Sequence, residues 1–447
     1  MTQFDADRIR PYEKNPFYWQ YKARPVLLLG GSVEDNLFQI PDIEEHLDLL
    51  ASVGGNYVRC TMSSRDEGNV WPFAKDEATG LYDLTKPGEE YWRRFERFCR
   101  LAVERDVIAQ FEMWDRFDFA RDPWRLNPYN PSNNVNYTAE ETGLKEIIDT
   151  HPGRKENAFF RSVPALEDNA IVLGYQRMQV DKMLSISLGC GNMLYCMDNE
   201  TNESPEWGAY WAKYIRAKAA AADVGVETTE MWDAWDLSDP QHANTYEHPE
   251  IYTFCDISQN SHRPADAHWQ KAQAFREMIA RSGHIRPVNT VKIYGANAGG
   301  YGNNRDGQER FWRNIFGGLA SSRFHRPPSG LGLSPRAQAH IRSMRLLTDA
   351  MDVFTCTAHN DLLERRSWNE AYCFANPGVE YAVFFTDGGE VLLDVSAVGA
   401  GPLTIRWLDI LESRMLDADV VTPTDGRVRL VTPTEAGFWA VLVRPMT

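Results

Sequence analysis

Short apolar runs alternate with longer amphipathic segments over roughly the first 355 residues of the chain. Residues 25–30 form a continuous apolar run that ends in glycine, as a buried parallel strand does. Residues 43–50 then repeat their apolar side chains at helical spacing, and Gly54 and Gly55 follow as a stop signal. The pattern therefore predicts a strand followed by a helix near the start of the chain.

The same alternation recurs further along. Strands are predicted at residues 56–61, 107–113, 193–197, 226–231, 252–257, 288–294 and, from a weaker pattern, 317–324. Helical spacing occupies residues 91–102, 206–222, 266–281 and 337–349. About eight strand–helix units in this length predict a (β/α)8 TIM barrel rather than an open doubly wound sheet. Gly30, Gly31 and Ser32 are also too few for a dinucleotide-binding fingerprint after the first strand.

The pattern changes after residue 357. From Glu370 onward no helical period remains, and the Asp-Gly pairs at residues 387–388 and 425–426 are typical of hairpin turns. Strands are predicted at residues 371–375, 381–385, 391–395, 403–408, 427–431 and 438–443. We therefore expect a catalytic barrel over residues 1–356 and a small antiparallel β-sandwich over residues 357–447.

Composition and charge narrow the class of protein. The chain has 447 residues, of which 43% are hydrophobic and 25% charged, as in folded globular proteins. A formal charge of −16 without a basic run argues against a nucleic-acid partner. No apolar stretch is long enough to span a membrane, and residues 1–15 lack the apolar core of a secretory signal. Seven scattered cysteines fit a reducing compartment, so we expect a cytoplasmic protein, which the small β-domain could assemble into a homo-oligomer.

Polar and aromatic side chains gather where the predicted strands end, which is where barrel enzymes carry their active sites. Carboxylates supply acid–base groups, amides bind hydroxyls, and indole rings stack on the apolar face of a sugar. Hydrolysis of a glycosidic bond needs this set, with one carboxylic acid to protonate the leaving oxygen and a second carboxylate to attack or activate water. Candidate substrate-binding residues are Asp35, Trp114, Asp115, Trp232, Asp233, Asp256, Asn260, His262, Lys292 and Tyr294. The histidines show no metal-binding spacing, so neither a metal nor a cofactor is expected.

Asn199 and Glu200 directly follow the fourth predicted strand. Here the sequence resembles the clan A glycoside hydrolases, retaining (β/α)8 enzymes whose fourth strand ends in Asn-Glu. The resemblance implies that Glu200 is the catalytic acid/base and that Asn199 binds a substrate hydroxyl beside the reacting carbon. Residues 15–30, with Asn-Pro-Phe-Tyr-Trp and then Pro-Val-Leu-Leu-Leu-Gly, look like the opening of the apiosidase-like barrel family. Residues 357–447 are similar to the collagen-binding-like domain that often follows such barrels.

The seventh predicted strand departs from the clan A pattern. Clan A enzymes carry the nucleophilic glutamate there, whereas this chain has Lys292, followed by Tyr294, and no carboxylate before Asp306. A lysine cannot be the carboxylate nucleophile of this mechanism. Lys292 could instead pair with a carboxylate or with an anionic group of the substrate.

Three interpretations of this departure remain open. The second carboxylate could come from another strand end, with Glu230 favoured and Asp115 and Asp256 as further candidates. The enzyme could be inverting, with its carboxylates further apart to admit a water molecule. Alternatively, the chain could be a non-catalytic carbohydrate-binding barrel derived from a glycosidase.

The loop after the third predicted strand is unusually long. Residues 114–137 are rich in Asn, Pro and aromatic side chains. The segment is longer than a minimal connection between a strand and a helix needs to be. We interpret the loop as a wall that narrows the site and favours exo-action on a small oligosaccharide or glycoside. A rigid packing loop is the alternative.

Overall fold

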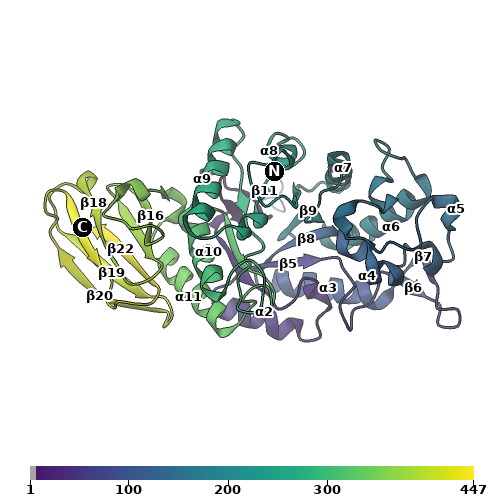
Figure 1. Ribbon diagram of the computed structural model, residues 1–447, viewed down its shortest axis with the longest axis horizontal. Helices are drawn as coiled ribbons and strands as arrows, with labels where there is room; N and C mark the ends of the chain where they lie inside the picture. Colours follow the sequence, from purple (N-terminus) through teal and green to yellow (C-terminus); the bar gives the residue numbers. More distant parts are fainter. Residues whose placement is uncertain (1–6, 447) are drawn as a thin grey trace.

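The computed structural model describes residues 7–446, and the first residues of the polar N-terminal segment lie outside this range. Eight parallel strand positions form the core of the larger part of the molecule (Figure 1). They are β4 (Leu28–Gly31), β5 (Tyr57–Thr61), β8 (Ile108–Asp115), β9 (Met193–Asn199), β10 (Glu227–Thr229), β11 (Cys255–Asp256), β12 (Val288–Asn289) and β13 (Ser321–Phe324).

Backbone hydrogen bonds close these strands into a ring. Six strands form one parallel sheet in the order β10-β9-β8-β5-β4-β13, and β11 pairs with β12. The amide of Thr253 donates to the carbonyl of Thr228 at 2.9 Å, which joins the segment before β11 to β10. The amide of Ala320 donates to the carbonyl of Val288 at 2.9 Å, which joins β12 to the segment before β13. The predicted (β/α)8 barrel is confirmed.

Helices cover the outside of the ring. The long ones are α2 (Ile43–Ser52), α3 (Glu89–Glu104), α6 (Ala170–Ser187), α7 (Pro205–Ala221), α9 (Ala265–Arg281), α10 (Asn304–Phe316) and α11 (Pro335–Asp349). Between β10 and β11, the only α-helix among the described residues is the one-turn helix α8 (Ala243–Tyr246). Local sequence fixes the starts of the last two helices: Asn303 and Asp306 form a capping box at α10, and Ser334 caps α11 ahead of Pro335.

Smaller elements close the ends of the barrel. A three-stranded N-terminal sheet, β1 (Arg10–Pro11), β2 (Trp19–Tyr21) and β3 (Arg24–Val26), places Trp19 against the barrel, where its indole donates to Asn289 Oδ1 at 2.9 Å. The hairpin of β6 (Phe73–Lys75) and β7 (Tyr82–Pro87) lies in the second strand–helix loop. The long third loop contains α4 (Arg121–Leu126) and α5 (Ala139–Thr142).

The C-terminal region is an antiparallel sandwich. The larger sheet has the order β14-β16-β17-β22-β19-β20 and the smaller one β15-β18-β21. Their bounds are β14 (Thr357–Ala358), β15 (Leu363–Glu364), β16 (Ala371–Asn376), β17 (Glu380–Phe385), β18 (Glu390–Asp394), β19 (Leu403–Asp409), β20 (Arg414–Val421), β21 (Arg427–Val431) and β22 (Trp439–Pro445). The sequence pattern missed β20, because this edge strand is mostly exposed and lacks a buried face. The predicted β-sandwich is confirmed, while the exact domain boundary stays a prediction.

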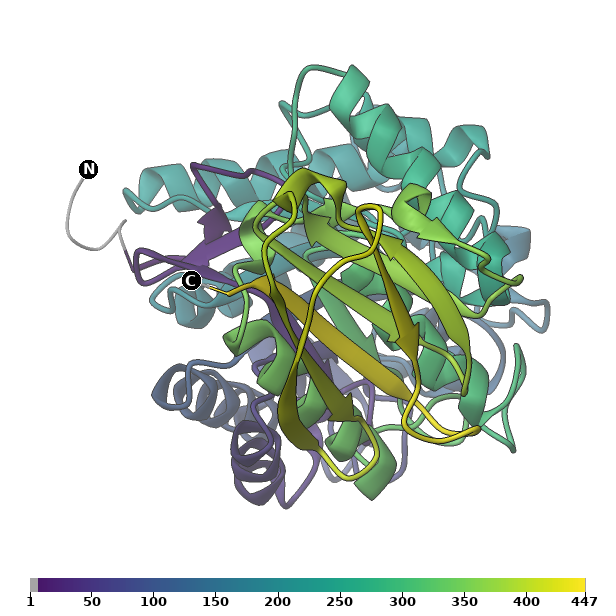
Figure 2. The ribbon, with the colours of Figure 1, turned by 90° about the vertical axis from the view of Figure 1, so that its left-hand side faces the viewer.

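The sandwich packs against the barrel through α10 and α11. Figure 2 views the molecule from the side of the sandwich, with the barrel behind it. Trp312 on α10 stacks on Phe384 of β17 with ring centroids 5.1 Å apart, and both belong to the same apolar core as the barrel. Among residues 7–446, no helix has the length and apolar character that a membrane crossing needs.

Candidate active site

A cavity of about 540 Å³ lies at the ends of the barrel strands where the loops begin. Its polar lining comes from β5 and from the loops after β4, β5, β8, β9, β12 and β13, so distant parts of the sequence meet here. Aromatic walls come from Phe117, Tyr294 and Tyr301. The volume lies within the range of small-molecule sites, and the position is the one where barrel enzymes bind substrate.

Glu200 lies in this lining, directly after β9. Its backbone has φ +53, the left-handed region that residues other than glycine adopt at a cost and that recurs at functional sites. Its Oε1 accepts hydrogen bonds from Lys292 Nζ at 2.5 Å and from the Tyr294 hydroxyl at 2.7 Å. Burial alone would raise the pKa of Glu200, but the Lys292 ammonium and the Tyr294 hydroxyl hold that pKa well below its usual range. Glu200 is therefore ionised in the free cavity.

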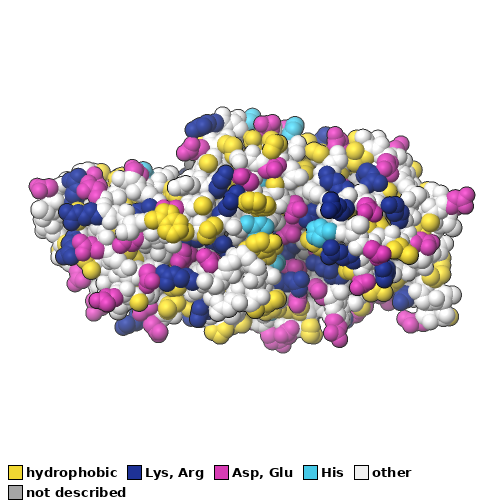
Figure 3. Space-filling view, in the orientation of Figure 1, with side chains coloured by type: hydrophobic (Ala, Val, Ile, Leu, Met, Phe, Trp, Pro, Cys, Tyr) yellow, Lys and Arg dark blue, Asp and Glu magenta, His cyan; other side chains and the backbone are white. Residues whose placement is uncertain are grey.

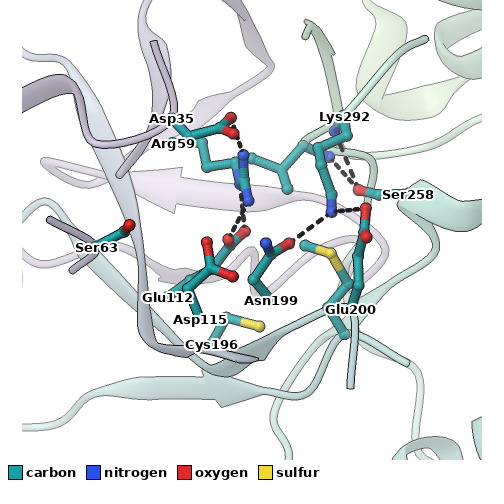
Figure 4. A network of polar contacts seen from close by, with 12 residues as sticks. Asp35, Arg59, Ser63, Glu112, Asp115, Cys196, Asn199, Glu200, Ser258 and Lys292 are labelled. Atoms are coloured by element: carbon teal, nitrogen blue, oxygen red, sulfur yellow. Dashed lines mark hydrogen bonds and ion pairs between the residues drawn. The ribbon is translucent and has the colours of Figure 1, made fainter. Parts of the chain in front are cut away.

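Lys292 is held in place on several sides (Figure 4). Its side chain is 1% exposed, and Nζ donates to Asn199 Oδ1 at 2.7 Å as well as to Glu200. Its backbone amide donates to Ser258 Oγ at 3.1 Å. The lysine thus occupies the end of the seventh strand and points at the carboxylate that follows the fourth.

Asp35 is the second carboxylate of the cavity lining within the described residues. Arg59 binds its Oδ1, and Arg326 Nε lies 2.8 Å from its Oδ2. Burial opposes ionisation of Asp35, but the guanidinium groups of Arg59 and Arg326 hold its pKa well below the usual range. His325 itself is neutral, because burial lowers its pKa well below the usual value. Asp35 is therefore also ionised.

Further ion pairs hold two arginines of the lining, Arg59 and Arg65, in place. Arg59 Nε donates to Glu112 Oε1 at 2.7 Å, and Glu112 is fully buried (Figure 4). Arg65 Nη1 lies 2.5 Å from Asp115 and 2.8 Å from Asp118. Buried pairs of this kind define geometry more than they add stability. Asp115, a predicted substrate-binding residue, thus positions Arg65 and does not itself line the cavity.

Glu230, the favoured second carboxylate, lies outside the cavity lining. It is 1% exposed, and its Oε1 accepts from the amides of Asp198 at 2.9 Å and Met231 at 3.0 Å. Its Oε2 points toward Gly208 on α7, where an added Cβ would lie only 2.2 Å away. Burial raises the pKa of Glu230, so this carboxyl is a protonated, buried group that ties β9 to β10.

Four other predicted residues are buried. Trp114 packs against Trp211 with ring centroids 5.3 Å apart, and Trp232 donates to Thr245 Oγ1 at 2.8 Å. Asp256 accepts from Gln110 at 2.9 Å, and Asn260 donates to the His268 carbonyl at 2.9 Å. None of these four lines the cavity in the described structure.

Two further predicted residues also lie outside the lining of the cavity. Asp233 lies 2.8 Å from Arg116, and His262 packs on Tyr301 with ring centroids 3.8 Å apart. The cavity therefore unites Asp35, Asn199, Glu200, Lys292 and Tyr294 from the predicted set.

Several residues of the lining were not among the candidate site residues chosen from the sequence. Arg65 and Arg121 follow the second and third strands, and His325 and Arg326 follow the eighth. His325 and Arg326 could have been found from their position directly after β13, but the sequence pattern that predicts this strand is weak. Within residues 7–446, no group of three or more His, Cys, Asp and Glu side chains is arranged to hold a metal ion.

Several solved structures with this architecture are glycoside hydrolases. A glycoside hydrolase family 5 protein from Bacteroides vulgatus has a TM-score of 0.67 at 11% identity, covering 100% of this chain and 95% of its own. Another glycoside hydrolase has a TM-score of 0.66 at 10% identity, with coverage of 100% and 98%. A maltogenic alpha-amylase, AmyB from Thermotoga neapolitana, reaches 0.55 at 10% identity, with coverage of 94% and 99%.

No family model matches the sequence, and no curated protein matches it. At identities this low, the likeness to solved structures establishes the fold alone. The chain thus shares its fold, a (β/α)8 barrel followed by a β-domain, with solved structures of glycoside hydrolases over its whole length.

Proposed function

We propose that this chain hydrolyses a glycosidic bond, with Glu200 and Asp35 as the two carboxylates that flank the sugar. The observation that carries the proposal is their shared cavity at the mouth of the barrel. Glu200 follows β9 and Asp35 follows β4, and the ring places β8 and β5 between these strands. Glycosidases need two carboxyl groups on either side of the scissile bond.

Asp35 replaces Glu230 in this proposal because of where the two side chains lie. A catalytic carboxylate must reach the anomeric carbon or its attacking water, so it must face the cavity. Asp35 does so, whereas Glu230 is buried beside Gly208. The low pKa that Arg59 and Arg326 impose on Asp35 also suits a carboxylate that attacks or activates water.

Glu200 is proposed as the general acid/base, the role that the clan A resemblance implies. Its ionisation in the free cavity means that it must take up a proton before it can protonate a leaving group. Asn199, which the Lys292 ammonium holds at 2.7 Å, is proposed to bind a substrate hydroxyl. Tyr294 keeps the Glu200 carboxyl oriented through its hydroxyl.

The third loop supports the exo-acting mode as part of the proposal. Phe117, Ala120, Arg121 and Pro123 belong to this loop, Pro152 lies later in the same connection between β8 and α6, and all five line the cavity. A wall of this kind limits the number of sugar units that fit. Membership of the apiosidase-like family, a collagen-binding-like role for the sandwich, a homo-oligomer and a cytoplasmic location remain predictions.

A panel of nitrophenyl glycosides and short oligosaccharides tests the proposal. We expect Glu200→Gln and Asp35→Asn each to lower kcat/KM on the hydrolysed substrate by roughly 10²–10⁴-fold. Glu206→Gln, on the exposed start of α7, and Glu230→Gln are the matched controls and should keep activity within about threefold.

Turnover that survives in Glu200→Gln would contradict the proposal. Saccharide binding by the wild-type chain without turnover of any bound member of the panel would also contradict it, and would support the carbohydrate-binding barrel instead.

A further inference from the structure

The cavity wall is basic, although the whole chain carries a formal charge of −16. Two carboxylates, Asp35 and Glu200, face the cavity, while five cationic side chains line it: Arg59, Arg65, Arg121, Lys292 and Arg326. In Figure 3, Lys and Arg side chains gather beside the hollow at the middle of the molecule. A neutral sugar gives no reason for this concentration of positive charge.

Two of these cations are already matched by carboxylates of the protein. Arg59 binds both Asp35 and Glu112, and Lys292 binds Glu200. Both side chains are 1% exposed, so they have little surface left for a ligand. Any binding of an anion must therefore come from the other three.

Arg65 and Arg326 retain donors that the protein does not use. Arg65 binds its carboxylate partners through Nη1, and Arg326 binds Glu34 through Nη1 and faces Asp35 with Nε. Among the described residues, no hydrogen bond engages Nη2 of either arginine. Their side chains are 14% and 27% exposed, so these donors are accessible.

Arg121 has the most available guanidinium. It is exposed, it lines the cavity, and its side chain makes no hydrogen bond or ion pair with any residue from 7 to 446. Its backbone has φ +56 and its amide donates to the Ile148 carbonyl at 2.6 Å. A left-handed conformation is costly for arginine, and such positions cluster at ligand-binding sites.

We propose that the substrate of the cavity is an acidic saccharide, whose negatively charged group is bound by Arg65, Arg121 and Arg326. This inference rests on the proposed function and specifies its substrate class. Planar guanidinium groups bind carboxylate, sulfate or phosphate oxygens through paired hydrogen bonds, and here three arginines from the loops after β5, β8 and β13 line one cavity. A sugar acid or an acidic sugar ester would meet all three.

An acidic substrate would also favour the protonated form of Glu200, which a general acid requires. A negative charge bound in the same cavity disfavours the ionised form of the Glu200 carboxyl and raises its pKa. Binding of the substrate would thus help Glu200 to take up the proton that a general acid must carry. A neutral substrate would raise that pKa only by displacing water from the carboxyl group.

Calorimetric titration of the wild-type chain at low temperature tests the inference, with product formation followed in the same samples. The probes are oligogalacturonates for carboxylate, chondroitin sulfate oligosaccharides for sulfate ester, mannose 6-phosphate for phosphate ester, and neutral cello- and galacto-oligosaccharides of matched length. We expect at least one acidic probe to bind at least tenfold more tightly than every neutral one. Arg121→Met should weaken that binding by roughly ten- to hundredfold, because a charge-assisted hydrogen bond is lost. Arg125→Met, an exposed arginine of the same helix that lies outside the cavity lining, is the control and should bind like wild type.

The inference is overturned if no acidic probe binds, if a neutral probe binds as tightly as all acidic ones, or if Arg121→Met binds like wild type. These results are distinguishable from failure of the proposed function. Hydrolysis of neutral glycosides alone would support the glycosidase function and contradict the acidic substrate. Tight binding of an acidic probe that is never hydrolysed would support the anion-binding site and contradict the glycosidase function.

Discussion

Lys292 Nζ and Glu200 Oε1 lie 2.5 Å apart in a part of the cavity wall that is largely shielded from water. Attraction between charges strengthens when water is excluded, so this pair determines the protonation state of Glu200. Tyr294 adds a neutral donor at 2.7 Å. If the lysine were removed, burial would dominate and the carboxyl would favour its protonated form.

We therefore expect Lys292→Met to raise the pKa of Glu200. A general acid acts only while protonated, so wild-type kcat/KM should already fall as pH rises from the acid range, because the pKa of Glu200 is low. In Lys292→Met this fall should move to higher pH. A pH–rate profile on the aryl glycoside from about pH 3 to pH 9 measures the shift.

Lys292→Arg keeps the positive charge and is the matched control, with a profile close to wild type. A profile that does not move in Lys292→Met would contradict the acid role of Glu200. A wild-type profile that is flat at neutral pH and falls only at low pH would indicate instead that Glu200 acts as an ionised base.

At single positions the sequence identified residue types better than side-chain directions. Asp35 and Glu230 both follow strands of the barrel, and both were candidates for the site. Only the structure shows that Glu230 turns toward α7, where Gly208 leaves room for its carboxyl. Neighbouring side chains of a strand point to opposite faces, so an uncertainty of one residue in a strand end reverses the direction.

At the scale of elements, the strands with mostly apolar side chains were the predictable ones. β8 and β9 are fully buried over their whole lengths and were recognised from composition. β13 reads Ser-Ser-Arg-Phe and is equally buried, because Arg323 donates to the Val291 carbonyl at 2.6 Å instead of packing as an apolar residue. This polar strand explains why the residues after it, His325 and Arg326, were missed.

Glu230 joins two of these strands and gives a prediction about stability. Burial raises its pKa in the folded chain, so above about pH 4.5 the folded chain keeps a proton that the unfolded chain releases. Stability should therefore fall as pH rises through this range, by up to about 1.4 kcal/mol per pH unit for this group. Glu230→Gln keeps an oxygen for the two backbone amides and removes the titration.

Thermal unfolding at several pH values between about 5 and 8 measures this effect. The melting temperature of Glu230→Gln should decline less with rising pH than that of wild type, whereas the exposed control Glu206→Gln should follow wild type. Equal slopes in all three proteins would contradict a proton held at position 230.

At the scale of the whole molecule, the sandwich supports the barrel without entering its cavity. Its larger sheet shares an apolar core with α10 and α11, and Arg305 at the start of α10 lies 3.0 Å from Asp387 of the sandwich. The loops that precede these two helices carry Tyr301 and Arg326, which line the cavity. The sequence predicted two domains, but the contact between them depends on which faces remain apolar after folding.

The central claim is that one sugar binds between Glu200 and Asp35 at the mouth of the ring. A crystal structure of Glu200→Gln with an intact, normally hydrolysed saccharide tests it most directly. We expect the anomeric carbon to lie between the side chains of residues 200 and 35, with any acidic group of the sugar toward Arg121. A sugar bound away from this cavity, or one whose anomeric carbon lies out of reach of Asp35, would contradict it.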